Sequence, residues 1–150
     1  MSKPLLHTRV GYVYLPTIDI ERTARWYAQH LGLQVIDTFE DRGSRVAILH
    51  SPHKHAIAIV LVETGEDKPL SLSRNGSPFP VMSIQCPDLE YTHQYLREHQ
   101  VEVEAIHTLG AGEAKYFYFK DDQGHLLEAS WSQWDTVDEL KASFLNKEEV

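Results

Sequence analysis

One carboxylate stands out among the side chains that could do chemistry. Glu128 lies in the stretch Tyr116–Trp131, in which a polar turn over residues 121–124 joins two apolar segments typical of β-strands. Because side chains alternate across a strand, Glu128 faces away from Leu127 and Trp131. If the Leu127 face packs on helices, Glu128 lines a cavity or an interface. There it could act as a general base, or it could be a structural acid held by hydrogen bonds.

Histidines give the second chemical signal. His50, His53 and His55 gather around one expected turn, where a zinc or nickel site is conceivable, although turn histidines are more often solvated. His107 precedes a segment with two glycines, residues 109–113, which could form a mobile lid. The sequence contains no Ser-His-Asp ordering, phosphate-binding loop or dinucleotide fingerprint that would indicate a rival chemistry.

The elements that position these side chains are expected to come as two copies of one βαβββ unit. We predict module one over residues 9–63, a linker over residues 64–80, module two over residues 81–131 and a short amphipathic C-terminal helix over residues 135–147. Within module one, Pro16 is expected to end the first strand, because proline has no N–H to give to the ladder.

An internal repeat supports this division. Residues 18–21, Ile-Asp-Ile-Glu, match residues 87–90, Pro-Asp-Leu-Glu, and His30 follows the first tetrapeptide at the spacing at which His99 follows the second. Each unit is too small to bury its sheet alone, so the two are expected to pack together about a pseudo-twofold axis. The result would be a single α+β domain over residues 1–150, with a cupped mixed sheet and a cavity between the concave faces.

The composition limits the possible partners. The formal net charge of −8 and the pI near 5.5 disfavour nucleic acid as a partner, because phosphate binding needs clustered Lys and Arg. No apolar run approaches the roughly 20 residues that span a bilayer, and the N-terminus lacks the apolar core of a signal peptide. Cys86 is the single cysteine, which excludes an internal disulfide. We therefore expect a cytoplasmic protein that contacts neither membrane nor nucleic acid.

The chain resembles the vicinal oxygen chelate superfamily over about residues 9–131. The resemblance rests on Arg25-Trp26-Tyr27, on Leu31-Gly32-Leu33 and on the closing segment Asp-Asp-Gln-Gly-His-Leu-Leu-Glu over residues 121–128, where Asp122 stands in place of the usual proline. The superfamily includes glyoxalase I, extradiol dioxygenases, fosfomycin-resistance enzymes and bleomycin-resistance proteins. The resemblance implies the paired βαβββ fold, a small-molecule ligand or substrate and a homodimer.

Metal-using members of the superfamily hold a divalent ion with four side chains, one from the first strand and one from the last strand of each module. The resemblance and the internal repeat place these positions at Tyr12, Ala58, Val81 and Glu128. Divalent metals of this family need histidine, carboxylate or amide ligands, and neither alanine nor valine offers a lone pair. We therefore expect no family-type metal site and no other cofactor.

Strand alternation predicts which side chains line the cup. The expected ligand-binding residues are Tyr12, Tyr14, Val60, Ser83, Gln85, Tyr116, Tyr118 and Ser130, with Glu128 as the catalytic candidate. Tyrosine rings combine an apolar body with a hydroxyl and a negative π-face, so a flat or cationic organic ligand would suit them. Our first hypothesis is a glyoxalase/bleomycin-resistance-like protein that binds such a ligand beside a degenerate metal site. The alternatives are a metal-dependent lyase, isomerase or dioxygenase that uses Glu128, and a filled cup with an interaction role.

Overall fold

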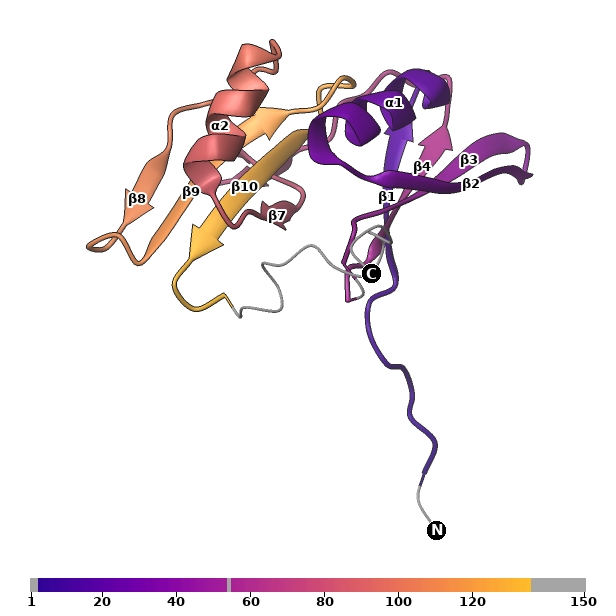
Figure 1. Ribbon diagram of the computed structural model, residues 1–150. Helices are drawn as coiled ribbons and strands as arrows, with labels where there is room; N and C mark the ends of the chain where they lie inside the picture. The colour runs from indigo at the N-terminus through magenta and orange to yellow at the C-terminus, as the bar shows by residue number, and fades with distance from the viewer. Residues whose placement is uncertain (1–2, 54, 136–150) are drawn as a thin grey trace, which may run out of the picture.

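Two four-stranded sheets lie side by side in the computed structural model, each covered by one helix on one face (Figure 1). The structure describes residues 3–53 and 55–135. The arrangement confirms the predicted α+β class and its two βαβββ modules. The helix predicted over residues 135–147 lies outside the described residues, apart from Asp135. Within the described ranges, no helix is long and apolar enough to cross a membrane.

Module one forms a mixed sheet in the order β1-β4-β3-β2, in which β1 runs parallel to β4. Its elements are β1 (Tyr12–Thr17), α1 (Ile20–Leu31), β2 (Gln34–Asp41), β3 (Ser44–His50) and β4 (Ala58–Glu63). Helix α1 begins after Asp19, whose carboxylate accepts the Arg22 N–H at 3.1 Å. It ends at Gly32, whose φ of 70° is the left-handed conformation that glycine adopts without strain.

Module two repeats this topology in the order β7-β10-β9-β8. Its elements are β7 (Ser83–Gln85), α2 (Leu89–Glu98), β8 (His107–Leu109), β9 (Ala114–Lys120) and β10 (Leu126–Ser132). Helix α2 is capped by Asp88, which accepts the Tyr91 N–H at 3.0 Å. The two modules therefore share the aspartate cap as well as the strand order, as the sequence repeat predicts.

The segment between the modules is not a plain linker. It carries a small hairpin of β5 (Leu72–Arg74) and β6 (Ser77–Phe79), joined by Asn75 and Gly76. Both turn residues have positive φ, 52° and 82°, which is the backbone of the tight turns that match strand twist. Because Asn-Gly is a strong hairpin signal, this element could have been predicted from the sequence.

Pro16 does not end β1, because β1 is an edge strand. The strand continues to Thr17, and Pro16 lies opposite Val62 of β4 in the register. The backbone groups of β1 face β4 and the sheet edge alternately, and the Pro16 position faces the edge, where no N–H is needed for the ladder. The outward Pro16 carbonyl instead accepts a hydrogen bond from His125 of module two at 2.7 Å.

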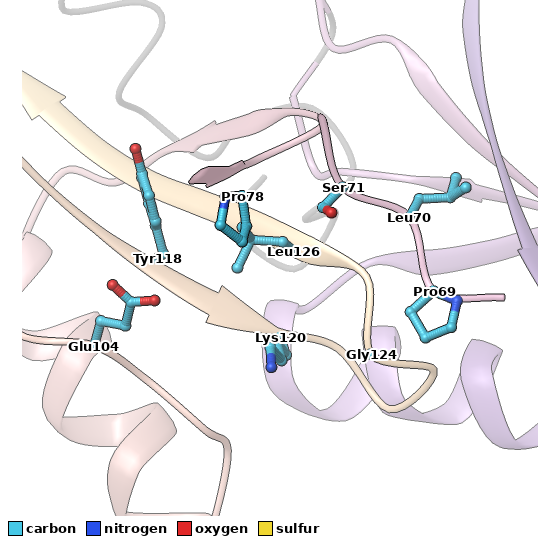
Figure 2. A pocket seen from close by; sticks show the side chains of 9 residues that line it. All are labelled: Pro69, Leu70, Ser71, Pro78, Glu104, Tyr118, Lys120, Gly124 and Leu126. Atoms are coloured by element: carbon cyan, nitrogen blue, oxygen red, sulfur yellow. The ribbon is translucent and has the colours of Figure 1, made fainter. Parts of the chain in front are cut away.

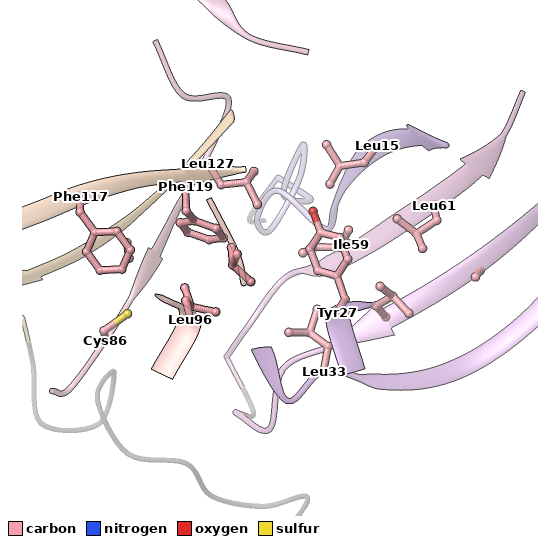
Figure 3. Close-up of a cluster of buried hydrophobic side chains, with 14 of the residues drawn as sticks. Leu15, Tyr27, Leu33, Ile59, Leu61, Cys86, Leu96, Phe117, Phe119 and Leu127 are labelled. Carbon is pink, nitrogen blue, oxygen red and sulfur yellow. The ribbon is translucent and has the colours of Figure 1, made fainter. Parts of the chain in front are cut away.

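A single core joins the helix-covered faces of both sheets (Figure 3). The fully buried side chains include Leu15 and Leu61 from module one and Phe117, Leu127 and Ala129 from module two, each at most 2% exposed. Strand alternation predicts this inward set. Among residues 3–53 and 55–135, both helices lie on this core side, and strand alternation places the candidate site residues on the opposite, concave faces of the sheets.

Candidate functional site

The concave face of module two gathers most of the predicted site residues. Glu128 lies between Ser83 of β7 and Tyr118 of β9, and it is directly opposite each of them in the register. Ser130 is the next residue of β10 on the same face, and its Oγ lies 2.9 Å from Ser83 Oγ. Within the described part of the chain, the Glu128 carboxylate forms no hydrogen bond or ion pair with another side chain. Glu128 is therefore available to a ligand.

Gln85 and Tyr116 complete the predicted set on this face. Tyr116 is opposite Ser130, which in turn is opposite Gln85 across the sheet. The Gln85 amide nitrogen donates to Asp135 Oδ1 at 2.9 Å, so this side chain is already engaged at the edge of the face. Strand alternation thus places these six predicted residues on one surface.

The predicted residues of module one lie on the other sheet. Tyr12 is opposite Ala58 and Tyr14 is opposite Val60. The two tyrosines are 58% and 61% exposed, whereas Val60 is 6% exposed. Among the described residues, neither tyrosine stacks on or hydrogen-bonds to a side chain of module two. The structure therefore divides the predicted set between two surfaces.

A row of aromatic rings crosses the concave face of module two. His107 stacks on Tyr116 with ring centroids 5.3 Å apart, Tyr116 lies 5.5 Å from Tyr118, and Phe79 of the hairpin meets Tyr118 edge-on at 6.3 Å. The guanidinium of Arg74 lies 5.2 Å from the centroid of the Phe79 ring. Phe79 was not predicted from the sequence, because its place on this face depends on how the hairpin folds back over the sheet. The row offers a flat organic molecule a stacking surface.

A cavity of about 460 Å³ lies at the end of this row, beneath the segment that joins the modules. Its lining residues are Pro69, Leu70, Ser71, Pro78, Glu104, Tyr118, Lys120, Gly124 and Leu126. Figure 2 shows Tyr118 and Glu104 at one end of the cavity and Pro69 with Gly124 at the other. Its volume falls within the range of about 300–1,000 Å³ that is typical of small-molecule sites.

The electrostatic surroundings of Tyr118 are mainly negative. Its loss of water contact raises the pKa of the Tyr118 hydroxyl, and the neighbouring Tyr116 and the Glu128 carboxylate raise it further, while Arg74 opposes them. The Glu104 carboxylate acts in the same direction as Glu128. Tyr118 therefore stays protonated and can donate a hydrogen bond to a ligand.

A buried histidine fixes residues 69–71, the part of the joining segment that lines the cavity and is called its roof here. His125 is fully buried, its Nδ1 accepts the Leu70 N–H at 2.8 Å, and its Nε2 lies 2.7 Å from the Pro16 carbonyl oxygen. Since a carbonyl only accepts, Nε2 carries the proton and Nδ1 is the acceptor, which fixes a neutral imidazole. His125 therefore connects three parts of the chain: module one, the roof segment and the turn of module two.

The rest of the same turn binds module one through polar side chains. The Gln123 carbonyl oxygen accepts from Thr17 Oγ1 at 3.1 Å and from an Arg22 guanidinium nitrogen at 2.8 Å, and its amide donates to Asp67 at 2.6 Å. The adjacent Asp122 carboxylate accepts from Arg22 Nε at 2.8 Å. The Asp-Asp-Gln-Gly-His turn, which the sequence identifies only as a turn, is thus a junction between the modules.

The family's four metal positions do not provide a metal-binding donor set. Tyr12 is opposite Ala58 in module one, and the register places Ser83, rather than Val81, directly opposite Glu128 in module two. With Ser83 in place of Val81, the four positions are Tyr12, Ala58, Ser83 and Glu128. They offer one carboxylate, two hydroxyls and a methyl group, which match no preferred divalent site. No group of three or more His, Cys, Asp or Glu side chains in the described ranges is placed to hold a metal ion.

Comparison with known proteins identifies the family. Residues 9–129 match the Glyoxalase/Bleomycin resistance protein/Dioxygenase superfamily. No curated protein matches the sequence at a significant level. Among solved structures, the antibiotic binding protein TnmS3 from Streptomyces sp. CB03234 has a TM-score of 0.68 at 15% identity, covering 87% of this chain and 100% of that chain.

Two further structures share the fold. The fosfomycin resistance protein FosX from Listeria monocytogenes has a TM-score of 0.66 at 16% identity, covering 89% of this chain and 98% of that chain. The glyoxalase family protein from Enterococcus faecalis has a TM-score of 0.66 at 16% identity, covering 84% of this chain and 99% of that chain. With the match over residues 9–129, the chain belongs to the glyoxalase/bleomycin resistance protein/dioxygenase superfamily.

Proposed function

We propose that this protein binds a small organic molecule on the concave face of module two, without the divalent metal that metal-using members of its superfamily hold. The observation that carries the proposal is the aromatic row of His107, Tyr116, Tyr118 and Phe79, which leads to a cavity of about 460 Å³. Apolar lining with a few polar groups is typical of ligand sites. The similarity in fold to an antibiotic binding protein agrees with a binding role.

A flat neutral fluorophore, prodan, tests this site. We expect saturable, blue-shifted emission at one equivalent of probe per chain, and we expect Tyr118→Leu to weaken binding about fivefold, because it removes an aromatic contact. Tyr91→Leu is the matched control, since Tyr91 is 65% exposed on α2, away from the concave face. Binding that is equally strong in the Tyr118 and Tyr91 variants would show that the probe sits elsewhere.

The absence of a family-type metal is tested separately. Protein purified without chelators is analysed for divalent metals, and the same analysis is made on Glu128→Gln. Because Glu128 is the only strong donor among the four family positions, we expect substoichiometric metal that is unchanged by the substitution. One ion per chain that is lost in Glu128→Gln would overturn this part of the proposal.

A second candidate is an enzyme that uses Glu128, namely a metal-dependent lyase, isomerase or dioxygenase of the same superfamily. One observation favours it: the Glu128 carboxylate has no side-chain partner among the described residues. Glu128 is also directly opposite Tyr118 in the strand register, next to a hydroxyl that can donate a hydrogen bond. A carboxylate that is free to reach a substrate can act as a general base. Turnover of a glyoxalase or dioxygenase substrate that is abolished in a folded Glu128→Gln variant would favour this candidate over the first.

We also propose a homodimer. Tyr12 and Tyr14 are large aromatic side chains on the concave face of module one, and both are more than half exposed. Burial of such rings against a second copy would recover apolar surface that a monomer leaves in water. Light scattering should give a dimer mass at micromolar concentration. The double variant Tyr12→Ser/Tyr14→Ser should lower the dimer fraction, and a monomer in the unsubstituted protein would refute this proposal.

A further inference from the structure

Two carboxylates flank the Tyr118 ring, and neither has a cationic partner in the described part of the chain. Glu128 is directly opposite Tyr118 on β10. Glu104 lies on the other side of β9, where its backbone N–H bonds to the Tyr118 carbonyl at 2.9 Å, and it lines the cavity. The two acids thus sit on either side of the ring that divides the aromatic row from the cavity.

The nearby cations are already engaged. Lys120 Nζ lies 3.2 Å from Glu102 Oε2, so its charge is offset by a neighbour outside the cavity lining. Arg74 lies over the Phe79 ring, 5.2 Å from its centroid. Among the residues that the structure describes, Glu104 and Glu128 therefore lack an ion-pair partner, and Arg74 is the one guanidinium close to the Tyr118 ring. The site carries a net negative charge within a chain whose formal net charge is −8.

We infer that the ligand of this site is an organic cation, a protonated or quaternary amine that carries an apolar or aromatic body. This inference rests on the proposed function and adds the chemical class of the ligand. The amine would lie on the face of Tyr118 between Glu104 and Glu128, and the apolar body would extend toward Leu126 and Pro78 in the cavity. Aromatic faces attract cations, and carboxylates on either side add Coulomb attraction.

Three probes with the same phenyl ring and different charges test the class. Benzyltrimethylammonium is a cation, benzyl alcohol is neutral and benzoate is an anion. Their dissociation constants are measured by NMR titration of the ¹⁵N-labelled full chain, with the shifts of Tyr118 and its neighbours as the readout. We expect the cation to bind about tenfold more tightly than benzoate and to weaken as salt is added.

Variants that remove one charge at a time test the predicted direction of the change in cation affinity. Glu104→Gln and Glu128→Gln should each weaken the cation about threefold, whereas Arg74→Gln should strengthen it by a similar factor. Glu40→Gln is the control, since Glu40 is an exposed acid on the outer strand β2 of module one. None of the three site substitutions removes a buried apolar group, so the fold should persist, and circular dichroism checks this.

The outcomes separate this inference from the proposed function. If the cation binds best and the two glutamine variants lower its affinity, both stand. If benzyl alcohol or benzoate binds at Tyr118 as tightly as the cation, the binding function stands and the cationic class is wrong. If no phenyl probe shifts the Tyr118 resonances, the proposed binding face itself is refuted, and the inference with it.

Discussion

Replacement of His125 tests whether one imidazole couples the cavity roof to both modules. In His125→Leu, the side-chain volume stays similar, but the Leu70 N–H and the Pro16 carbonyl lose their partners at 2.8 and 2.7 Å. A buried backbone group without a partner costs about 1–3 kcal/mol, and two such groups at a partly buried location suggest a loss of about 3 kcal/mol in the free energy of unfolding. Urea denaturation followed by tryptophan fluorescence measures this loss.

Two conservative variants of His125 separate the two bonds. Asparagine places its side-chain carbonyl near the Nδ1 position, so it can still accept the Leu70 N–H but cannot reach Pro16. Glutamine places its amide nitrogen near the Nε2 position, so it can still donate to the Pro16 carbonyl and loses the Leu70 contact. We expect each variant to lose about half of the stability lost in His125→Leu. Hydrogen exchange at the Leu70 amide should accelerate in the glutamine variant and stay slow in the asparagine variant.

The control and the refuting result follow from the internal repeat. His55 is the module-one counterpart of His125, and it is exposed, so His55→Leu should leave the free energy of unfolding almost unchanged. The reasoning would be refuted if His125→Leu were as stable as His55→Leu. It would also be refuted if the Leu70 amide exchanged at the same rate in the asparagine and glutamine variants.

Two further predictions concern the same turn. Tyr27→Phe removes the hydroxyl that donates to the Asp121 carboxylate at 2.6 Å, and should cost about 1.5–3 kcal/mol at neutral pH, as measured by urea denaturation. Burial raises the pKa of Asp121 above its ordinary 3.8, and the Tyr27 hydroxyl opposes this rise because it stabilises the ionised carboxylate. The stability lost in Tyr27→Phe should therefore be present above the folded-state pKa of Asp121 and shrink as the pH falls through it. A stability loss that grew on acidification would contradict this role of the Tyr27 hydroxyl. Gly124→Ala should lower the free energy of unfolding by about 1 kcal/mol or more, because Gly124 has a φ of 92° and an added Cβ would lie 3.1 Å from Pro69 Cγ. Gly65→Ala, where nothing lies within 4 Å and no positive φ is needed, should be close to neutral in the same urea denaturation, and equal effects at the two glycines would show that neither the Pro69 contact nor the positive φ of Gly124 matters.

The common face of the candidate site residues in module two could be predicted from the sequence because it depends on strand alternation. Glu128, Ser130, Tyr116 and Tyr118 share a face for the same local reason that Phe117 and Leu127 share the other. One feature was out of reach. The register that sets Ser83 opposite Glu128 is a pairing between distant strands, whereas the resemblance and the internal repeat suggested Val81 instead. The local pattern gives the face of a residue, but it does not give its partner across the sheet.

The sequence by itself determined the two βαβββ modules, their aspartate caps and the inward apolar faces, because each depends on residue type and short-range periodicity. Only the tertiary structure decided that the Asp-Asp-Gln-Gly-His turn joins the modules. Gln123 and His125 bond to Thr17 and Pro16 across more than half of the chain. It also decided that the hairpin brings Phe79 to Tyr118 and that the module-two face carries its own cavity. These features arise from contacts between residues far apart in the chain, which no local sequence pattern encodes.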